Sequence, residues 1–96
     1  MRALDHEQTR VGRAPDMITA PVGDGALIMH VTGGNFIELN PQAARIWELL
    51  DTPQTLSGLC TIILDRYDVA AEQCRADIGA LLEEMLKLEL VRIERA

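Results

Sequence analysis

The 96-residue sequence predicts an α+β domain of the winged helix-turn-helix type, in which three antiparallel strands precede three helices. Three observations predict this fold class. Residues 16–40 form short β-rich segments separated by glycine turns, residues 41–88 repeat apolar side chains at helical spacing, and the last two helical segments are joined by a tight turn. A chain of this length buries one small core, so we expect a single domain.

The composition predicts a folded, aliphatic protein with an acidic surface. Hydrophobic residues make up 48% of the chain and charged residues 25%, which excludes a disordered chain. Nine Lys and Arg against fifteen Asp and Glu give a net charge of −6, and this charge repels a phosphate backbone. Nucleic-acid binding would therefore need a local basic stripe.

The two cysteines and the hydropathy pattern predict the cellular setting. Cys60 and Cys74 form neither a CxxC pair nor a disulfide framework, and the first residues lack the apolar segment of a secretory signal. No apolar run approaches the ~20 residues that span a bilayer. We therefore expect a reduced, cytoplasmic protein that makes no contact with a membrane.

The first part of the chain predicts an arm followed by three strands. Residues 1–15 show neither strand nor helix periodicity, so we expect a flexible N-terminal arm without core residues and a folded domain over 16–96. Strands are predicted over 17–22, 26–31 and 35–39, joined by glycine-containing turns.

The third strand carries the first functional indication. Side chains alternate across a strand, so Ile37 and Leu39 should face the core while Phe36 and Glu38 share a partly exposed face. Phe36 is either a shielded strand residue or an exposed anchor. An unpaired outer edge here would offer N–H and C=O groups to an incoming strand, and a neighbouring helix would supply apolar pockets.

Helix boundaries follow from capping residues. Asn40 at the N-cap and Pro41 at the first helical position predict the start of the first helix, and Thr55 predicts the start of the second. A third helix is predicted over about 70–88, and the alternating residues 90–94 could form a short closing strand. The predicted buried stripes are Ala43, Ile46, Trp47 and Leu50; Leu56, Leu59, Cys60, Ile63 and Tyr67; and Cys74, Ile78, Leu81, Leu82, Met85, Leu86 and Leu88.

The third helix argues against DNA binding. Helix-turn-helix geometry would place it in a major groove, yet residues 68–89 carry six acidic and two basic residues, a net charge of −4. Its apolar arc spans on the order of 160°, wider than a one-sided surface helix needs, so another segment should cover its margin. Gly79 leaves a notch that either another chain or the first helix of this protein would fill.

The sequence offers little for catalysis. His6, His30, Cys60 and Cys74 lie in different segments, and no HxxxH, CxxC, GxSxG or P-loop pattern is present. We interpret His30 as a half-exposed strand residue and both cysteines as core residues. No catalytic residue, metal ligand or cofactor is therefore predicted.

The residue pattern over 35–91 resembles the PqqD family, whose members are also described as precursor-peptide recognition elements. The resemblance lies in three segments: Phe36-Ile37-Glu38-Leu39-Asn40-Pro41 through Leu50-Asp51, Thr55 through Tyr67-Asp68-Val69, and Arg75-Ala76-Asp77-Ile78 through Leu86. It implies a winged-helix-like, non-catalytic protein that binds the leader segment of a ribosomally made precursor peptide as an added strand. It also implies delivery of that peptide to a modifying enzyme such as a radical SAM protein, a leader peptidase or a cyclase.

The resemblance also implies a set of peptide-binding residues. The leader would lie beside the third strand, with the third helix as the opposite wall; Leu39 and Ile78 are equally well explained as core residues. The implied residues are Asn35, Phe36, Ile37, Glu38 and Leu39 on the strand and Arg75, Ile78, Gly79, Leu82 and Leu86 on the helix.

One segment departs from the pattern of the quinone-cofactor pathway. Members resembling that pathway's protein have a Leu-rich second strand and an Ala-Pro-Glu turn where this chain has residues 29–34. Lasso-peptide and other radical-enzyme pathways therefore stay open beside pyrroloquinoline quinone synthesis. The alternatives to a peptide adaptor are a winged-helix DNA-binding protein and a structural subunit that forms a homodimer through the same strand edge.

Overall fold

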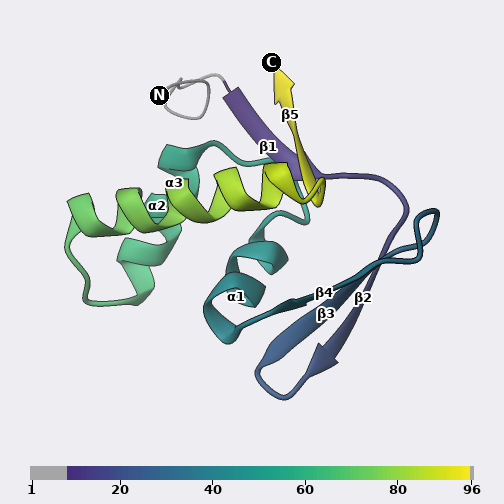
Figure 1. The fold of residues 1–96 in the computed structure, drawn as a ribbon. Helices are drawn as coiled ribbons and strands as arrows, with labels where there is room; N and C mark the ends of the chain where they lie inside the picture. Colours follow the sequence, from purple (N-terminus) through teal and green to yellow (C-terminus); the bar gives the residue numbers. More distant parts are fainter. Residues whose placement is uncertain (1–8, 96) are drawn as a thin grey trace.

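The computed structural model describes residues 9–95 and shows an α+β domain (Figure 1). Three helices follow a run of strands and a short strand closes the chain, which confirms the predicted fold class and the closing strand. The elements in chain order are β1 (Thr9–Arg13), β2 (Met17–Val22), β3 (Gly25–His30), β4 (Phe36–Leu39), α1 (Pro41–Leu49), α2 (Leu56–Arg66), α3 (Ala71–Lys87) and β5 (Val91–Arg95).

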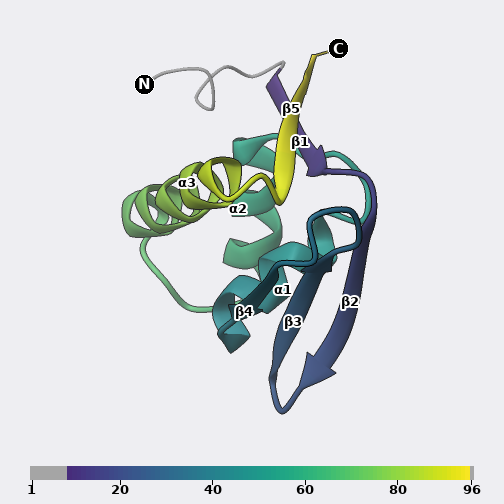
Figure 2. The same cartoon turned by 45° about the vertical axis from the view of Figure 1, so that its right-hand side comes forward.

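The strands form two separate antiparallel sheets. One has the order β2-β3-β4, and the other pairs β1 with β5. All three helices lie on one side of the three-stranded sheet, with α1 directly against it (Figures 1 and 2). Gly23 in the β2–β3 turn has a φ of 60°, a left-handed conformation that glycine adopts without strain.

Strand β1 corrects the prediction of an arm without core residues. Residues 9–13 pair with β5 from Thr9↔Arg95 to Arg13↔Val91, and Val11 and Thr9 are fully buried. The prediction was wrong because the strand's partner lies some 80 positions further along the chain, where local periodicity gives no signal. Residues 1–8 of the predicted arm lie outside the described residues.

The helix caps are the ones that the sequence predicts. The Asn40 side chain accepts a hydrogen bond from the Ala43 N–H at 2.8 Å, and Pro41 occupies the first turn of α1. Thr55 accepts from the Gly58 N–H at 2.9 Å at the start of α2. Both contacts satisfy N–H groups that a helix leaves unpaired, so α1 and α2 begin at fixed residues.

Trp47 of α1 connects the two sheets. Its side chain is 1% exposed, and its indole N–H donates to Thr19 Oγ1 on β2 at 2.9 Å. On the other side, the guanidinium of Arg13 on β1 lies 4.7 Å from the ring centroid and donates to the Trp47 carbonyl at 2.8 and 3.2 Å. One residue thus fixes the position of α1 relative to both sheets.

We predict that Arg13→Lys lowers the free energy of unfolding by about 1–3 kcal/mol, because a lysine cannot donate twice to the Trp47 carbonyl while stacking on its ring. Urea denaturation followed by Trp47 fluorescence measures the change. Arg10→Lys, an exposed arginine on the same strand, is the matched control and should change stability by less than about 0.5 kcal/mol. Equal effects of the two substitutions would contradict this role of Arg13.

Candidate functional site

The outer edge of β4 has unpaired backbone groups. Among residues 9–95 no strand pairs with this edge, since β4 ends the order β2-β3-β4. The His30 N–H donates to the Asn35 carbonyl at 3.0 Å, and hydrogen bonding alternates along an antiparallel pair, so Asn35, Ile37 and Leu39 direct their backbone groups to β3. The N–H and C=O of Phe36 and Glu38 therefore point away from the sheet.

The other edge of the sheet, β2, is less suited to pairing. The Val31 N–H donates to the Asp16 carbonyl at 3.0 Å, and the same alternation directs the backbone of Met17, Thr19 and Pro21 outward. Pro21 has no N–H, so one of the three outward donors of β2 is missing. The sheet thus has one edge suited to strand addition, and it is β4.

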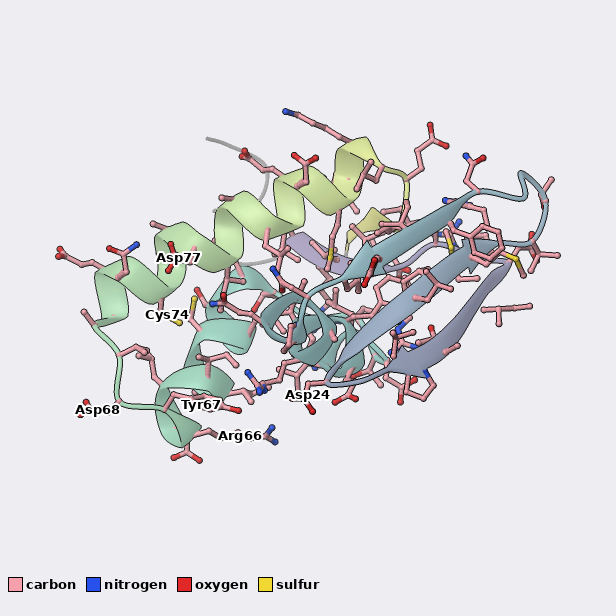
Figure 3. All side chains as sticks on the ribbon, turned by 60° about the horizontal axis from the view of Figure 1, so that its bottom comes forward. Asp24, Arg66, Tyr67, Asp68, Cys74 and Asp77 are labelled. Atoms are coloured by element: carbon pink, nitrogen blue, oxygen red, sulfur yellow. The ribbon has the colours of Figure 1, made fainter. Side chains whose placement is uncertain are left out.

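A groove of about 880 Å³ begins where β4 ends. It lies between the start of α1, the end of α2 and one side of α3, and β4 is the strand of its sheet nearest to α3 (Figures 1 and 3). The groove is lined mainly by apolar side chains, with a few polar groups at its mouth. The lining residues are Asn40, Pro41, Gln42, Ala43, Arg45, Ile46, Ile63, Tyr67, Val69, Gln73, Cys74, Asp77, Ile78, Ala80 and Leu81.

Two polar contacts border the groove. The guanidinium of Arg45 lies 5.2 Å from the centroid of the Tyr67 ring, which connects α1 to the end of α2. On α3, Gln73 Nε2 donates to Asp77 Oδ1 at 2.8 Å, and Figure 3 labels Asp77 on the helix wall beside Cys74. An extended peptide on the β4 edge would thus meet apolar pockets beyond Leu39, with Asp77 on the far wall.

The strand residues predicted as a binding site lie where the sequence places them. Leu39 is buried and Ile37 half-buried, while Phe36 and Glu38 are exposed on the other face, so the predicted alternation is confirmed. Phe36 is 63% exposed. The Asn35 carbonyl accepts the hydrogen bond from the His30 N–H of β3, and Asn35 lies just before the strand.

On α3 the structure brings only Ile78 of the five predicted residues into the groove. Arg75 donates to Ser57 Oγ of α2 at 3.2 Å, and a side chain at Gly79 would meet Leu56 of α2 at 3.8 Å. The notch at Gly79 therefore faces Leu56 of α2 rather than α1. The two remaining predicted residues, Leu82 and Leu86, lie on the same side of α3 as Arg75 and Gly79. Leu82 is fully buried and Leu86 is half-buried against the core.

Among the groove residues of α3 that the family resemblance did not supply are Asp77 and Leu81. They lie on the margin of the apolar arc that is turned away from α2, and Leu81 is only half-buried. The sequence did contain a signal for these residues, because the apolar arc of α3 is wider than packing against one neighbouring element requires. Which margin faces the groove depends on how α3 is rotated against α2, and this is a tertiary property.

The structure describes few groups suited to catalysis. His30 is half-buried on β3, and residues 9–95 contain no cluster of three His, Cys, Asp or Glu side chains that could hold a metal ion. Cys60 and Cys74 are free and buried, as predicted. Within the described part of the chain, no helix has the length and apolar character needed to cross a bilayer.

The face of the sheet turned away from α1 is apolar. The β2–β3–β4 register places Ile18, Met29 and Phe36 in one row and Ala20, Leu27 and Glu38 in the next. Ile18 is 50% exposed and Val22, on the same face, 48%. We call these residues the outward face; Glu38 is its only charged member.

The structure defines a winged-helix-like domain with one open strand edge beside an apolar groove. The family model for coenzyme PQQ synthesis protein D (PqqD) matches residues 25–91, and the chain therefore belongs to the PqqD family. This match spans all elements that build the edge and the groove. No curated protein matches the sequence.

Two solved structures share the fold. One is described as TbiB1 in complex with the TbiA(beta) leader peptide; it has a TM-score of 0.76 and 21% identity, and the match covers 84% of this chain and 94% of that one. The other is described as lasso peptide synthetase B1 complexed with the leader peptide, with a TM-score of 0.72, 20% identity and coverage of 88% and 98%. Both likenesses show the fold.

We predict that Cys60 makes stability fall at alkaline pH. Burial, and then the neighbouring Cys74, raise the pKa of the Cys60 thiol to about 11, so the folded state retains this proton after the unfolded state has released it. The free energy of unfolding should therefore decrease between about pH 9 and pH 11. Urea midpoints at several pH values should fall less steeply for Cys60→Ala; parallel curves would contradict the prediction.

Proposed function

We propose that the protein is an adaptor that binds the leader segment of a ribosomally made precursor peptide and presents it to a separate modifying enzyme. The leader would join the sheet as a strand along β4. The observation that carries this proposal is the outward backbone of Phe36 and Glu38 beside the apolar groove. Membership of the PqqD family and two leader-bound structures with the same fold support it.

Affinity and specificity would come from different parts of the site. Main-chain hydrogen bonds to Phe36 and Glu38 bind any extended peptide, whereas alternate side chains entering the groove distinguish one sequence from another. The proposed role requires binding alone. Catalysis would then belong to the partner enzyme.

The outward face is suited to contact with that enzyme. Ile18, Val22 and Phe36 are 48% to 63% exposed on one sheet surface, and an apolar surface of this kind is typical of a protein interface. A leader strand added to β4 would lie beside this face without covering it. The same sheet could then hold the peptide by its edge and the enzyme by its surface.

Two observations support a choice among the ribosomal peptide pathways. One leader-bound neighbour is a lasso peptide synthetase component, and residues 29–34 depart from the quinone-pathway pattern. We therefore favour a lasso or related ribosomal peptide pathway over pyrroloquinoline quinone synthesis. The buried free thiols favour a reducing compartment, the cytoplasm.

We predict that Glu38→Pro abolishes leader binding in a folded protein. Proline removes an N–H that faces the open edge, and edge strands accept proline at such positions. Glu38→Thr keeps the N–H and is the matched control, which should bind within about threefold of the wild type. Backbone-amide NMR titration with a leader peptide from a precursor encoded nearby, once one is identified, measures both, and the spectra without peptide report folding.

Ile37→Pro is unsuited to this test, because the Ile37 backbone faces β3 and the substitution would disrupt the sheet itself.

A second experiment needs no protein variant. Leader peptides N-methylated at successive residues should lose binding at every second position. Unchanged binding by folded Glu38→Pro, or no periodicity among the N-methylated peptides, would contradict strand addition at β4.

We predict that Ile18→Lys on the outward face separates the two roles. Leader affinity should stay within about twofold, because β2 is remote from the β4 edge, while modification of the precursor by its enzyme should slow by about tenfold or more. Leu64→Lys, at an exposed apolar residue of α2, is the control and should leave both unchanged. Wild-type modification rates with Ile18→Lys would show that the enzyme binds elsewhere.

A further inference from the structure

The negative charge of the protein is concentrated in two segments of the chain, the three-stranded sheet and the region of α3. Residues 14–44, which form the three-stranded sheet and its turns, contain Asp16, Asp24 and Glu38 but no Lys or Arg. Residues 68–89, which include α3, carry a net charge of −4. The net charge of the chain is −6, so the residues outside these two segments sum to +1.

Within the site, acidic side chains border the path of an added strand on both sides. Glu38 lies on β4 itself, and Asp77 lines the groove on α3. Glu84 follows Asp77 by seven residues, so it lies on the same side of α3 two turns further along. All three are exposed, and Leu81 lies between the two acids of α3.

The groove has little positive charge to balance these acidic side chains. Arg45 is the only Lys or Arg among the lining residues, and its guanidinium lies over the Tyr67 ring. A peptide carrying Asp or Glu would meet like charge at Glu38 on β4 and at Asp77 and Glu84 on α3, whereas Lys or Arg could lie along the apolar surface and place its charged end beside Asp77 or Glu84.

We propose that the groove selects peptides in which basic residues flank the apolar residues that enter it, and that Asp77 and Glu84 set this preference. The inference rests on the proposed function, because it concerns the peptide bound along β4. It assigns the chemical class of the ligand: an extended, apolar segment of positive net charge.

The test uses three short acetylated peptides of about ten residues with the same alternating apolar sequence. Three variable positions are all Lys, all Gln or all Glu. The dissociation constant of each peptide is measured by NMR titration, with the amides of Phe36 to Leu39 reporting the site. The Lys peptide should bind most tightly and the Glu peptide least, and this order should weaken as salt is raised from about 0.02 M to about 0.3 M.

Two double variants separate the groove from the overall field. Asp77→Asn with Glu84→Gln should reduce the ratio of Lys-peptide to Gln-peptide affinity by about three- to tenfold, as expected for two partly exposed charge pairs. Glu72→Gln with Glu83→Gln removes the same charge from positions turned about 100° to 140° away from Asp77 and Glu84 around α3, and should leave that ratio within about twofold.

The possible failures are distinct. Equal affinity of the three peptides at the β4 edge would overturn the charge preference while supporting the proposed function. An equal loss in both double variants would show that the net charge of the protein, and no local contact, sets the preference, and would overturn the role of Asp77 and Glu84. Binding with amide shifts away from β4 and α3 would contradict the proposed function as well.

Discussion

The contacts of Trp47 hold the two sheets in one arrangement. Arg13 from β1 stacks on its ring and bonds its carbonyl, while Thr19 from β2 accepts its indole N–H. Because α1 begins directly after β4, fixing α1 also fixes the end of the strand whose edge is open. The open edge and the groove are therefore positioned by contacts of a residue that does not itself line the groove.

The sheet is stabilised through one face only, and this explains why its other surfaces are available. Ala26, Ile28 and Leu39 are buried on the face towards α1, so the core does not need the outward face or the outer edge of β4. In many small domains such an edge would be covered or shortened. Here the domain keeps it open next to a groove, which separates the parts that maintain the fold from those that would bind partners.

The features predicted correctly from the sequence depend on local chemistry. Asn40, Pro41 and Thr55 determine where helices begin through contacts with residues three or four positions away, and the alternation in β4 follows from the pleat. Strand β1 and the groove wall of α3 depend on distant partners. Thr9 pairs with Arg95, and the rotation of α3 follows from contacts such as that between Arg75 and Ser57, which no local pattern contains.

The missing N–H of Pro21 has a consequence for stoichiometry. A sheet with two complementary edges could take up one strand on each side, and successive copies could join edge to edge into an open-ended filament. With the β2 edge interrupted by Pro21, only the β4 edge of this sheet is suited to pairing, so a strand added there would not be followed by one on the other side. Pro21 thus disfavours open-ended polymer growth through the edges of this sheet.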